Sequence, residues 1–114
     1  MQAFTINELI DQHGQAGKLY LEFLRVPALS AGLYILPAGN FDPQLPHTED
    51  EVYYIASGRA SLLVGDEDQE VTAGSLVFVP ANVEHRFHSI SENLTVLVFF
   101  APAEYSQARE EVRA

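Results

Sequence analysis

The spacing of hydrophobic residues along the chain changes near Lys18. Before that point, Thr5-Ile6-Asn7-Glu8 has the spacing of a helix capping box, which predicts a short helix over about residues 6–13 that ends at Gly14 and Gly17. After it, apolar residues occur in short runs that Gly, Pro, Asn or Asp interrupts every eight to twelve residues. This punctuation predicts that the rest of the chain is built from β-strands.

The apolar runs predict eight short strands, at residues 19–26, 32–36, 52–56, 60–64, 70–71, 75–79, 85–89 and 95–100. Strands of this number and length suit an all-β jelly roll or a small barrel. With 114 residues, the chain is long enough for one domain with a real core and too short for two. We therefore expect a single domain over residues 1–114 and one functional site.

Composition and charge narrow the possible partners. The net charge of -10, from 16 acidic against 6 basic residues, repels nucleic acid and anionic membrane surfaces. No apolar run approaches the length of a membrane helix, and residues 1–10 lack the pattern of a secretory signal, so we expect a cytoplasmic protein. A small molecule or a protein partner remains. Because the chain has no cysteine, any metal ion must be bound by nitrogen and oxygen.

One group of histidines and glutamates has the spacing of a metal site. His47 and Glu51 are four residues apart, which places them on the same side of an extended chain. His85 begins a later strand, and a barrel can bring it beside the first two. Two imidazoles and one carboxylate leave coordination positions open, as in catalytic zinc and non-haem iron(II) sites.

Two segments of the chain resemble the two conserved motifs of the cupin superfamily. In residues 39–58 the order is Gly, five residues, Leu-Pro-His, three residues, Glu, six residues, Gly. In residues 74–89 the order is Gly, five residues, Pro-Ala-Asn, two residues, His, three residues, Ser. The family usually has His where Leu45 stands, Gly at Asn82 and Asn at Ser89. The resemblance covers residues 32–100, most of the chain.

This resemblance implies a cupin-type jelly-roll β-barrel, which the helical segment predicted for residues 1–17 would precede and an arm over residues 101–114 would follow. It also implies that His47, Glu51 and His85 bind one divalent metal ion, with iron, zinc, manganese and nickel as candidates. Leu45 removes the fourth usual ligand, so water is expected to complete the coordination. The alternative is a cupin that kept the scaffold and lost the metal.

Strand alternation suggests which side chains surround such a site. Leu45, Tyr53 and Phe87 are predicted to form the pocket wall. Glu49 shares the alternation of His47 and is a candidate fourth ligand, although a solvent-facing or hydrogen-bonded carboxylate is preferred. Tyr53 and Glu49 are also the candidate acid or base groups. His88 lies an odd number of residues from His85 and is expected to face outward.

The resemblance permits several functions. One is an enzyme with dioxygenase, isomerase or lyase chemistry on a small organic substrate in the barrel. The other is a non-catalytic cupin that binds or senses a small molecule. A homodimer is expected in either case, with apolar contacts from Val52, Tyr54 and residues 96–100. Residues 104–114 are predicted to form either an amphipathic helix or an arm on a partner subunit.

Overall fold

The N-terminal helix begins where the capping box predicts. The structure is a computed structural model that describes residues 1–107, and its helix α1 spans Ile6–Ala16. The Thr5 side chain accepts a hydrogen bond from the Glu8 backbone N–H at 3.3 Å, and Gly17 ends the helix in the left-handed conformation. The predicted end near residue 13 was too early, because the helix accommodates Gly14. No helix within residues 1–107 has the length and hydropathy needed to cross a membrane.

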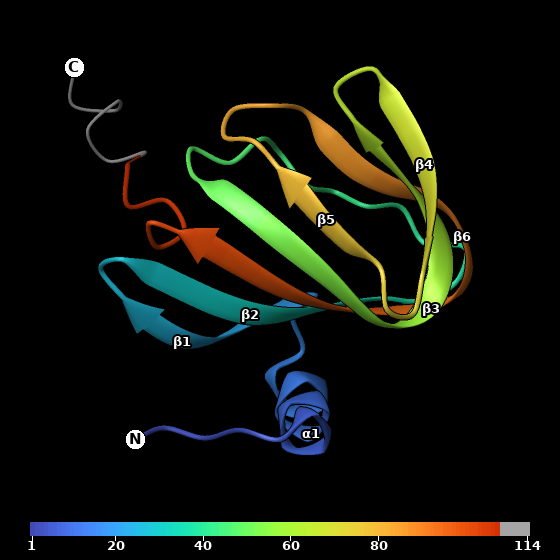
Figure 1. The fold of residues 1–114 in the computed structure, drawn as a ribbon. Coiled ribbons are helices and arrows are strands. Elements are labelled where there is room, and N and C mark those ends of the chain that lie inside the picture. The colour runs from blue at the N-terminus through green and yellow to red at the C-terminus, as the bar shows by residue number, and fades with distance from the viewer. Residues whose placement is uncertain (108–114) are drawn as a thin grey trace.

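The rest of the described chain forms one antiparallel sheet that rolls up on itself (Figure 1). The strand order is β1-β2-β6-β3-β4, and β5 pairs with β3. This arrangement confirms the predicted all-β, jelly-roll class with one short N-terminal helix, although the sheet is not closed within residues 1–107. The strands are β1 (Tyr20–Val26), β2 (Leu29–Leu36), β3 (Asp50–Val64), β4 (Glu67–Thr72), β5 (Leu76–Val79) and β6 (His85–Ala101).

Six strands replace the eight that the sequence predicted, because two pairs of predicted strands are continuous. Residues 52–56 and 60–64 both lie in β3, and residues 85–89 and 95–100 both lie in β6. Gly58, which lies between two of the predicted strands, is found at a shift in the pairing of β3 with β6, with φ of 100°. Such irregularities bend and twist a strand without ending it, which lets two long strands cross the whole rolled sheet.

The interior of the roll is apolar along most of its length and polar at one end. Alternate residues of β3 point inward, so Tyr53 and Ile55 are fully buried while Val52 and Tyr54 are exposed on the outer face. The buried cluster also includes Leu36, Leu62, Val71, Phe87, Leu94, Val96 and Phe100. Glu51 occupies the next inward position of β3 and begins the polar end, where the candidate site lies.

Candidate metal centre

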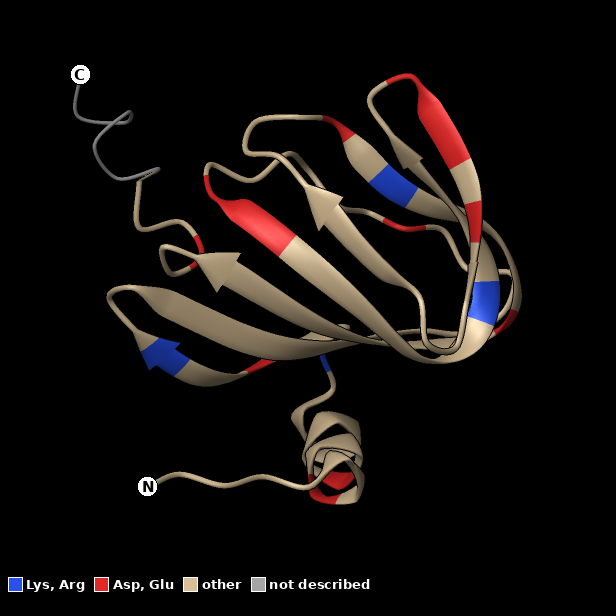
Figure 2. Ribbon diagram, viewed as in Figure 1, with Lys and Arg blue, Asp and Glu red and all other residues tan. Residues whose placement is uncertain are grey.

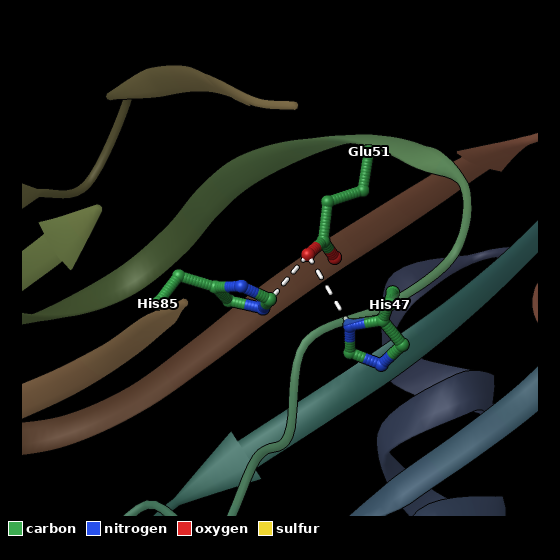
Figure 3. A group of neighbouring side chains, drawn as sticks. All are labelled: His47, Glu51 and His85. Atoms are coloured by element: carbon green, nitrogen blue, oxygen red, sulfur yellow. Dashed lines mark ion pairs between the residues drawn. The ribbon is translucent and has the colours of Figure 1, made fainter. Parts of the chain in front are cut away.

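The three predicted ligands meet at the polar end of the interior (Figure 3). Nε2 of His85 lies 2.9 Å from Oε1 of Glu51, and Nδ1 of His47 lies 3.5 Å from the same oxygen. One possible ligand atom from each residue lies within 4.8 Å of the other two. All three residues are buried, with 7%, 2% and 5% of His47, Glu51 and His85 exposed.

Backbone contacts hold the two histidines beside each other although they come from different parts of the chain. His47 lies in the loop before β3, and His85 is the first residue of β6. The N–H of Asn82 donates to the carbonyl of His47 at 2.7 Å, which ties this loop to the turn before β6. Asn82 has a φ of 65°, a region that Asn adopts more readily than most residues, and this explains why the cupin motif usually has Gly there.

The buried atoms at the centre of the site fit a bound cation. Nδ1 of His85 lies 2.9 Å from the carbonyl of Val83, so it carries the ring proton and donates. Nε2 of a neutral His85 is then an acceptor that faces a carboxylate. Four buried atoms here have no hydrogen-bond partner: Nδ1 of His47, both carboxylate oxygens of Glu51 and Nε2 of His85. When both rings are neutral, these atoms are acceptors without a donor, which is costly, and a divalent metal ion would satisfy all of them.

The electrostatics of the cluster agree with this geometry. Burial favours the neutral form of Glu51, but the two imidazoles outweigh it and lower the pKa of the carboxyl group. Burial likewise disfavours charge on His47, yet Glu104 and Glu51 raise its pKa to about 9. The pKa of His85 is raised by Glu51 against the same effect of burial. The carboxylates therefore attract positive charge, which protons or a metal ion can supply.

Leu45, predicted to form part of the pocket wall, lies at the outer edge of the site rather than in the buried interior. Its side chain is 74% exposed and borders a hollow of about 170 Å³ whose walls also include Gln44 and His85. The loop before β3 is not a regular strand, so side chains there do not alternate as the prediction assumed. Gln44 points inward instead, where its amide oxygen accepts a hydrogen bond from the Tyr53 hydroxyl at 3.0 Å.

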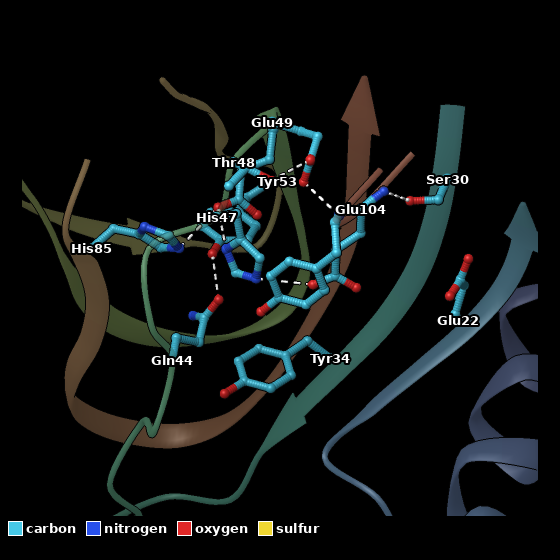
Figure 4. Close-up of polar contacts among 12 residues, drawn as sticks. Glu22, Ser30, Tyr34, Gln44, His47, Thr48, Glu49, Tyr53, His85 and Glu104 are labelled. Carbon is cyan, nitrogen blue, oxygen red and sulfur yellow. Dashed lines mark hydrogen bonds and ion pairs between the residues drawn. The ribbon is translucent and has the colours of Figure 1, made fainter. Parts of the chain in front are cut away.

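Glu49 is buried, but its carboxylate forms hydrogen bonds with the C-terminal part of the described chain (Figure 4). It accepts hydrogen bonds from the backbone N–H groups of Tyr105 at 2.6 Å and Gln107 at 3.0 Å, and from the Thr48 hydroxyl. Glu49 is not part of the group whose ligand atoms converge. Of the two roles considered for it, the structure favours a hydrogen-bonded carboxylate over a fourth ligand.

Tyr53 and Phe87 lie in the interior beside the site. Both are buried, and the Tyr53 ring centroid lies 5.1 Å from that of Phe87 and 6.2 Å from that of His85. Burial and the charge of Glu51 raise the Tyr53 pKa well above its ordinary value, so the hydroxyl stays neutral and donates to Gln44. His88 is only partly buried, and its Nε2 lies 2.8 Å from the carboxylate of Asp68 on β4 rather than near the site.

Two residues next to the site were not predicted from the sequence. Oε2 of Glu104 lies 2.9 Å from Nε2 of His47, and the Tyr105 ring stacks on the His47 ring with centroids 5.3 Å apart. Both belong to a turn over residues 103–107 that folds back over the site, where a helix was one of the two predictions. The rest of that predicted segment, residues 108–114, lies outside the described residues. The spacing of the motifs carries no signal for this turn.

A small cavity adjoins His47 on the side of this turn. Its volume is about 180 Å³, and its walls include Tyr20, Tyr34, Gln44 and Glu104. The Tyr20 hydroxyl is buried and has no hydrogen-bond partner. A small molecule that enters this cavity would therefore contact the Tyr20 hydroxyl, the Glu104 carboxylate and the edge of His47, a candidate metal ligand.

Comparison with known proteins identifies the family. Residues 32–100 match the Cupin_2 family, described as a cupin domain, so the chain belongs to the cupins. It is 51% identical over 104 residues to the uncharacterized protein SCO3923 of Streptomyces coelicolor, covering 91% of this chain and 99% of that protein.

Solved structures agree with this assignment. A cupin-family protein with a double-stranded β-helix fold from Methanocaldococcus jannaschii is 21% identical, with a TM-score of 0.68 over 85% of this chain and 86% of that chain. The DMSP lyase DddQ of Ruegeria pomeroyi is 27% identical, with a TM-score of 0.62. That match covers 67% of this chain and only 39% of the lyase.

Proposed function

We propose that the protein is a metal-dependent cupin enzyme that binds one divalent ion through His47, Glu51 and His85 and acts on a small organic molecule in the adjoining cavity. The observation that carries this proposal is the convergence of two imidazole nitrogens and both oxygens of Glu51, four buried polar atoms without a hydrogen-bond partner. Burying a carboxylate between two imidazoles is unfavourable unless positive charge compensates it. A metal ion provides that charge and leaves positions open for substrate.

The donor set restricts the metal and the chemistry. Two imidazoles and a carboxylate suit iron(II), zinc, manganese or nickel, and a metal of this kind supplies a Lewis acid that polarises an oxygen of the substrate. Val83 fixes the proton of His85 on Nδ1 and so presents Nε2 to the metal. Dioxygenase, isomerase and lyase reactions are all compatible with this set, and the likeness to DddQ draws attention to the lyase class.

The cavity limits the size of the ligand. Its volume of about 180 Å³ is below the roughly 300–1,000 Å³ of pockets for drug-sized ligands. Its polar groups are the unpaired hydroxyl of Tyr20 and the carboxylate of Glu104. We expect a small organic compound with a few heavy atoms and at least one hydrogen-bond donor.

A second candidate function is binding without turnover, and one observation favours it. The two groups first considered as acid or base are both engaged, since Tyr53 donates to Gln44 and Glu49 accepts two backbone amides. Under this alternative, the metal and cavity capture a ligand and release it unchanged. Catalysis, by contrast, would depend on the metal itself and on the groups that line the cavity.

Metal analysis of protein purified without an affinity tag tests the metal proposal. Wild type should contain close to one metal ion per chain by mass spectrometry, and His47→Ala, Glu51→Ala and His85→Ala should each lose it. His88→Ala is the matched control, because it removes a histidine paired with Asp68 outside the site and should keep the metal. Wild type that neither contains nor takes up metal would contradict the proposal.

The two candidate functions can be distinguished by incubating the protein with a mixture of small organic acids, alcohols and amines and recording proton NMR spectra. Consumption of one component by the metal-loaded wild type, and not by Glu51→Ala, indicates an enzyme. Line broadening of a component without consumption, again dependent on Glu51, indicates binding alone.

A further inference from the structure

The turn over residues 103–107 is held against the metal centre by its backbone. Two of its N–H groups donate to the buried carboxylate of Glu49, and the N–H of Glu104 donates to the Ser30 hydroxyl at 2.8 Å (Figure 4). The carbonyl of Glu104 also accepts from the Arg25 side chain at 2.9 Å. These contacts fix the path of the main chain, and the Glu104 side chain is thereby directed at His47.

The His47 ring is bracketed by two carboxylates. Its Nε2 lies 2.9 Å from Glu104, whose side chain is only 13% exposed, and its Nδ1 lies 3.5 Å from Glu51. A carboxylate only accepts hydrogen bonds, so the closer contact places the ring proton of a neutral His47 on Nε2. The lone pair of Nδ1 then points toward Glu51 and His85.

His85 is arranged in the opposite sense. Its Nδ1 donates to the carbonyl of Val83 at 2.9 Å, so its Nε2 faces the centre of the site. Each histidine thus has one nitrogen held by an acceptor outside the ligand group and the other nitrogen turned inward. Acceptors of this kind fix the orientation of metal-binding histidines and make them better ligands.

We propose that Glu104 is a positioning residue that makes His47 bind the metal through Nδ1, while His85 binds through Nε2, and that Glu49 serves to hold the turn that carries Glu104. This inference rests on the proposed metal-binding function. It accounts for a glutamate, Glu49, that is almost completely buried two residues from a ligand and yet outside the ligand group. It also gives the C-terminal turn a role in the site.

Metal affinity provides the first test. Apoprotein is titrated with zinc against a chromophoric chelator, using wild type, Glu104→Ala, Glu104→Gln and Glu67→Ala. The last variant removes an exposed carboxylate in β4 and so controls for the change in net charge. We expect Glu104→Ala to bind zinc about 10–100-fold more weakly, as for other partners of metal-binding histidines. Glu104→Gln should recover part of the affinity, because its amide oxygen still accepts from Nε2.

Wild-type affinity in Glu104→Ala would overturn the positioning role while leaving the metal site intact. If wild type itself binds no zinc through His47, Glu51 and His85, the proposed function fails, and this inference fails with it. Equal losses in Glu104→Ala and Glu104→Gln would also contradict the proposal, because the hydrogen bond would then not be the cause.

Nitrogen NMR of the imidazole rings in the zinc-loaded protein provides a readout that a purely structural role would not give. We expect His47 to show a zinc-bound Nδ1 and a protonated Nε2, and His85 to show the reverse. In Glu104→Ala this pattern should change at His47 and persist at His85. Zinc bound to Nε2 of His47 in wild type would overturn the inference.

The part assigned to Glu49 has its own test in hydrogen exchange. Glu49→Ala should accelerate exchange of the Tyr105 and Gln107 amides and weaken zinc binding in the same direction as Glu104→Ala. Unchanged exchange at those two amides would show that Glu49 does not hold the turn. Glu67→Ala again serves as the control.

Discussion

Glu49 and Glu51 are both buried and lie two positions apart, yet different partners stabilise them. Glu49 accepts hydrogen bonds from backbone amides, which satisfy a carboxylate without any counter-ion. Glu51 instead faces the imidazoles of His47 and His85, which are its ion-pair partners within residues 1–107. The same residue type therefore holds a turn in one case and forms the centre of a metal site in the other.

The histidines give the apoprotein a pH-dependent stability with a definite sign. The pKa of His47 is 6.5 in the unfolded chain and about 9 in the folded one, so the folded state binds this proton more tightly. The resulting stabilisation is complete below pH 6.5 and disappears as the pH rises through about 9. His85, whose pKa is also raised, acts in the same direction.

We therefore predict that the free energy of unfolding of metal-free protein falls between about pH 6.5 and 9, by at most about 1.4 kcal/mol per pH unit for each group. Urea denaturation at a series of pH values, in the presence of a chelator, measures this free energy of unfolding. His47→Gln should flatten this dependence, and identical slopes for wild type and variant would contradict the assignment.

The sequence located the site residues better than it located their surroundings. His47, Glu51 and His85 follow from motif spacing, because the motifs fix where each strand begins relative to its turn. The exposure of Leu45 did not follow from strand alternation, because the loop before β3 is not a regular strand. Glu104 was missed because its contact with His47 joins positions far apart in the chain, which no local pattern records.

At the scale of elements, β3 depends on the irregular pairing around Gly58. A side chain at this position would overlap the backbone carbonyl of Asn93 on β6, and the φ of 100° is itself unfavourable for other residues. The sequence predicted two separate strands on either side of this glycine, since glycine is found both at bulges and at the ends of strands. The continuous β3 carries Glu51 at one end and pairs with β4 at the other.

Gly58→Ala and Gly74→Ala form a matched pair that tests this role. Both positions have positive φ, but a side chain at Gly74 would have open space around it. We predict a loss of about 1–2 kcal/mol in unfolding free energy for Gly74→Ala from backbone strain. Gly58→Ala should lose clearly more, because the overlap with Asn93 adds to the strain. If chemical denaturation gave equal losses of unfolding free energy for the two variants, the close approach to Asn93 would not contribute to stability.

At the scale of the whole molecule, one face of the sheet is not covered by any other part of residues 1–107. Val52 and Tyr54 of β3 pair with Phe78 and Leu76 of β5, and all four side chains are exposed together with Phe99 of β6. None of these five residues is charged, on a chain whose net charge is -10, and Figure 2 shows that β5 carries no charged residue. Because the chain is strongly negative, most surfaces of two copies would repel each other, whereas this uncharged face would not.

We accordingly expect a homodimer that buries this apolar face. Light scattering during size-exclusion chromatography should give twice the chain mass for wild type. The double substitution Leu76→Asp and Phe78→Asp should shift it to the monomer mass, because it places two charges at the centre of the face. A monomeric wild type at high micromolar concentration would contradict the expectation.

The central claim is that one metal ion binds among His47, Glu51 and His85, and anomalous X-ray diffraction tests it most directly. Crystals of metal-loaded protein should show one strong anomalous peak per chain at the metal's absorption edge. We predict this peak within about 2.0–2.2 Å of a nitrogen from each histidine and an oxygen of Glu51. An empty site in metal-saturated crystals, or a peak bound by other residues, would contradict the account.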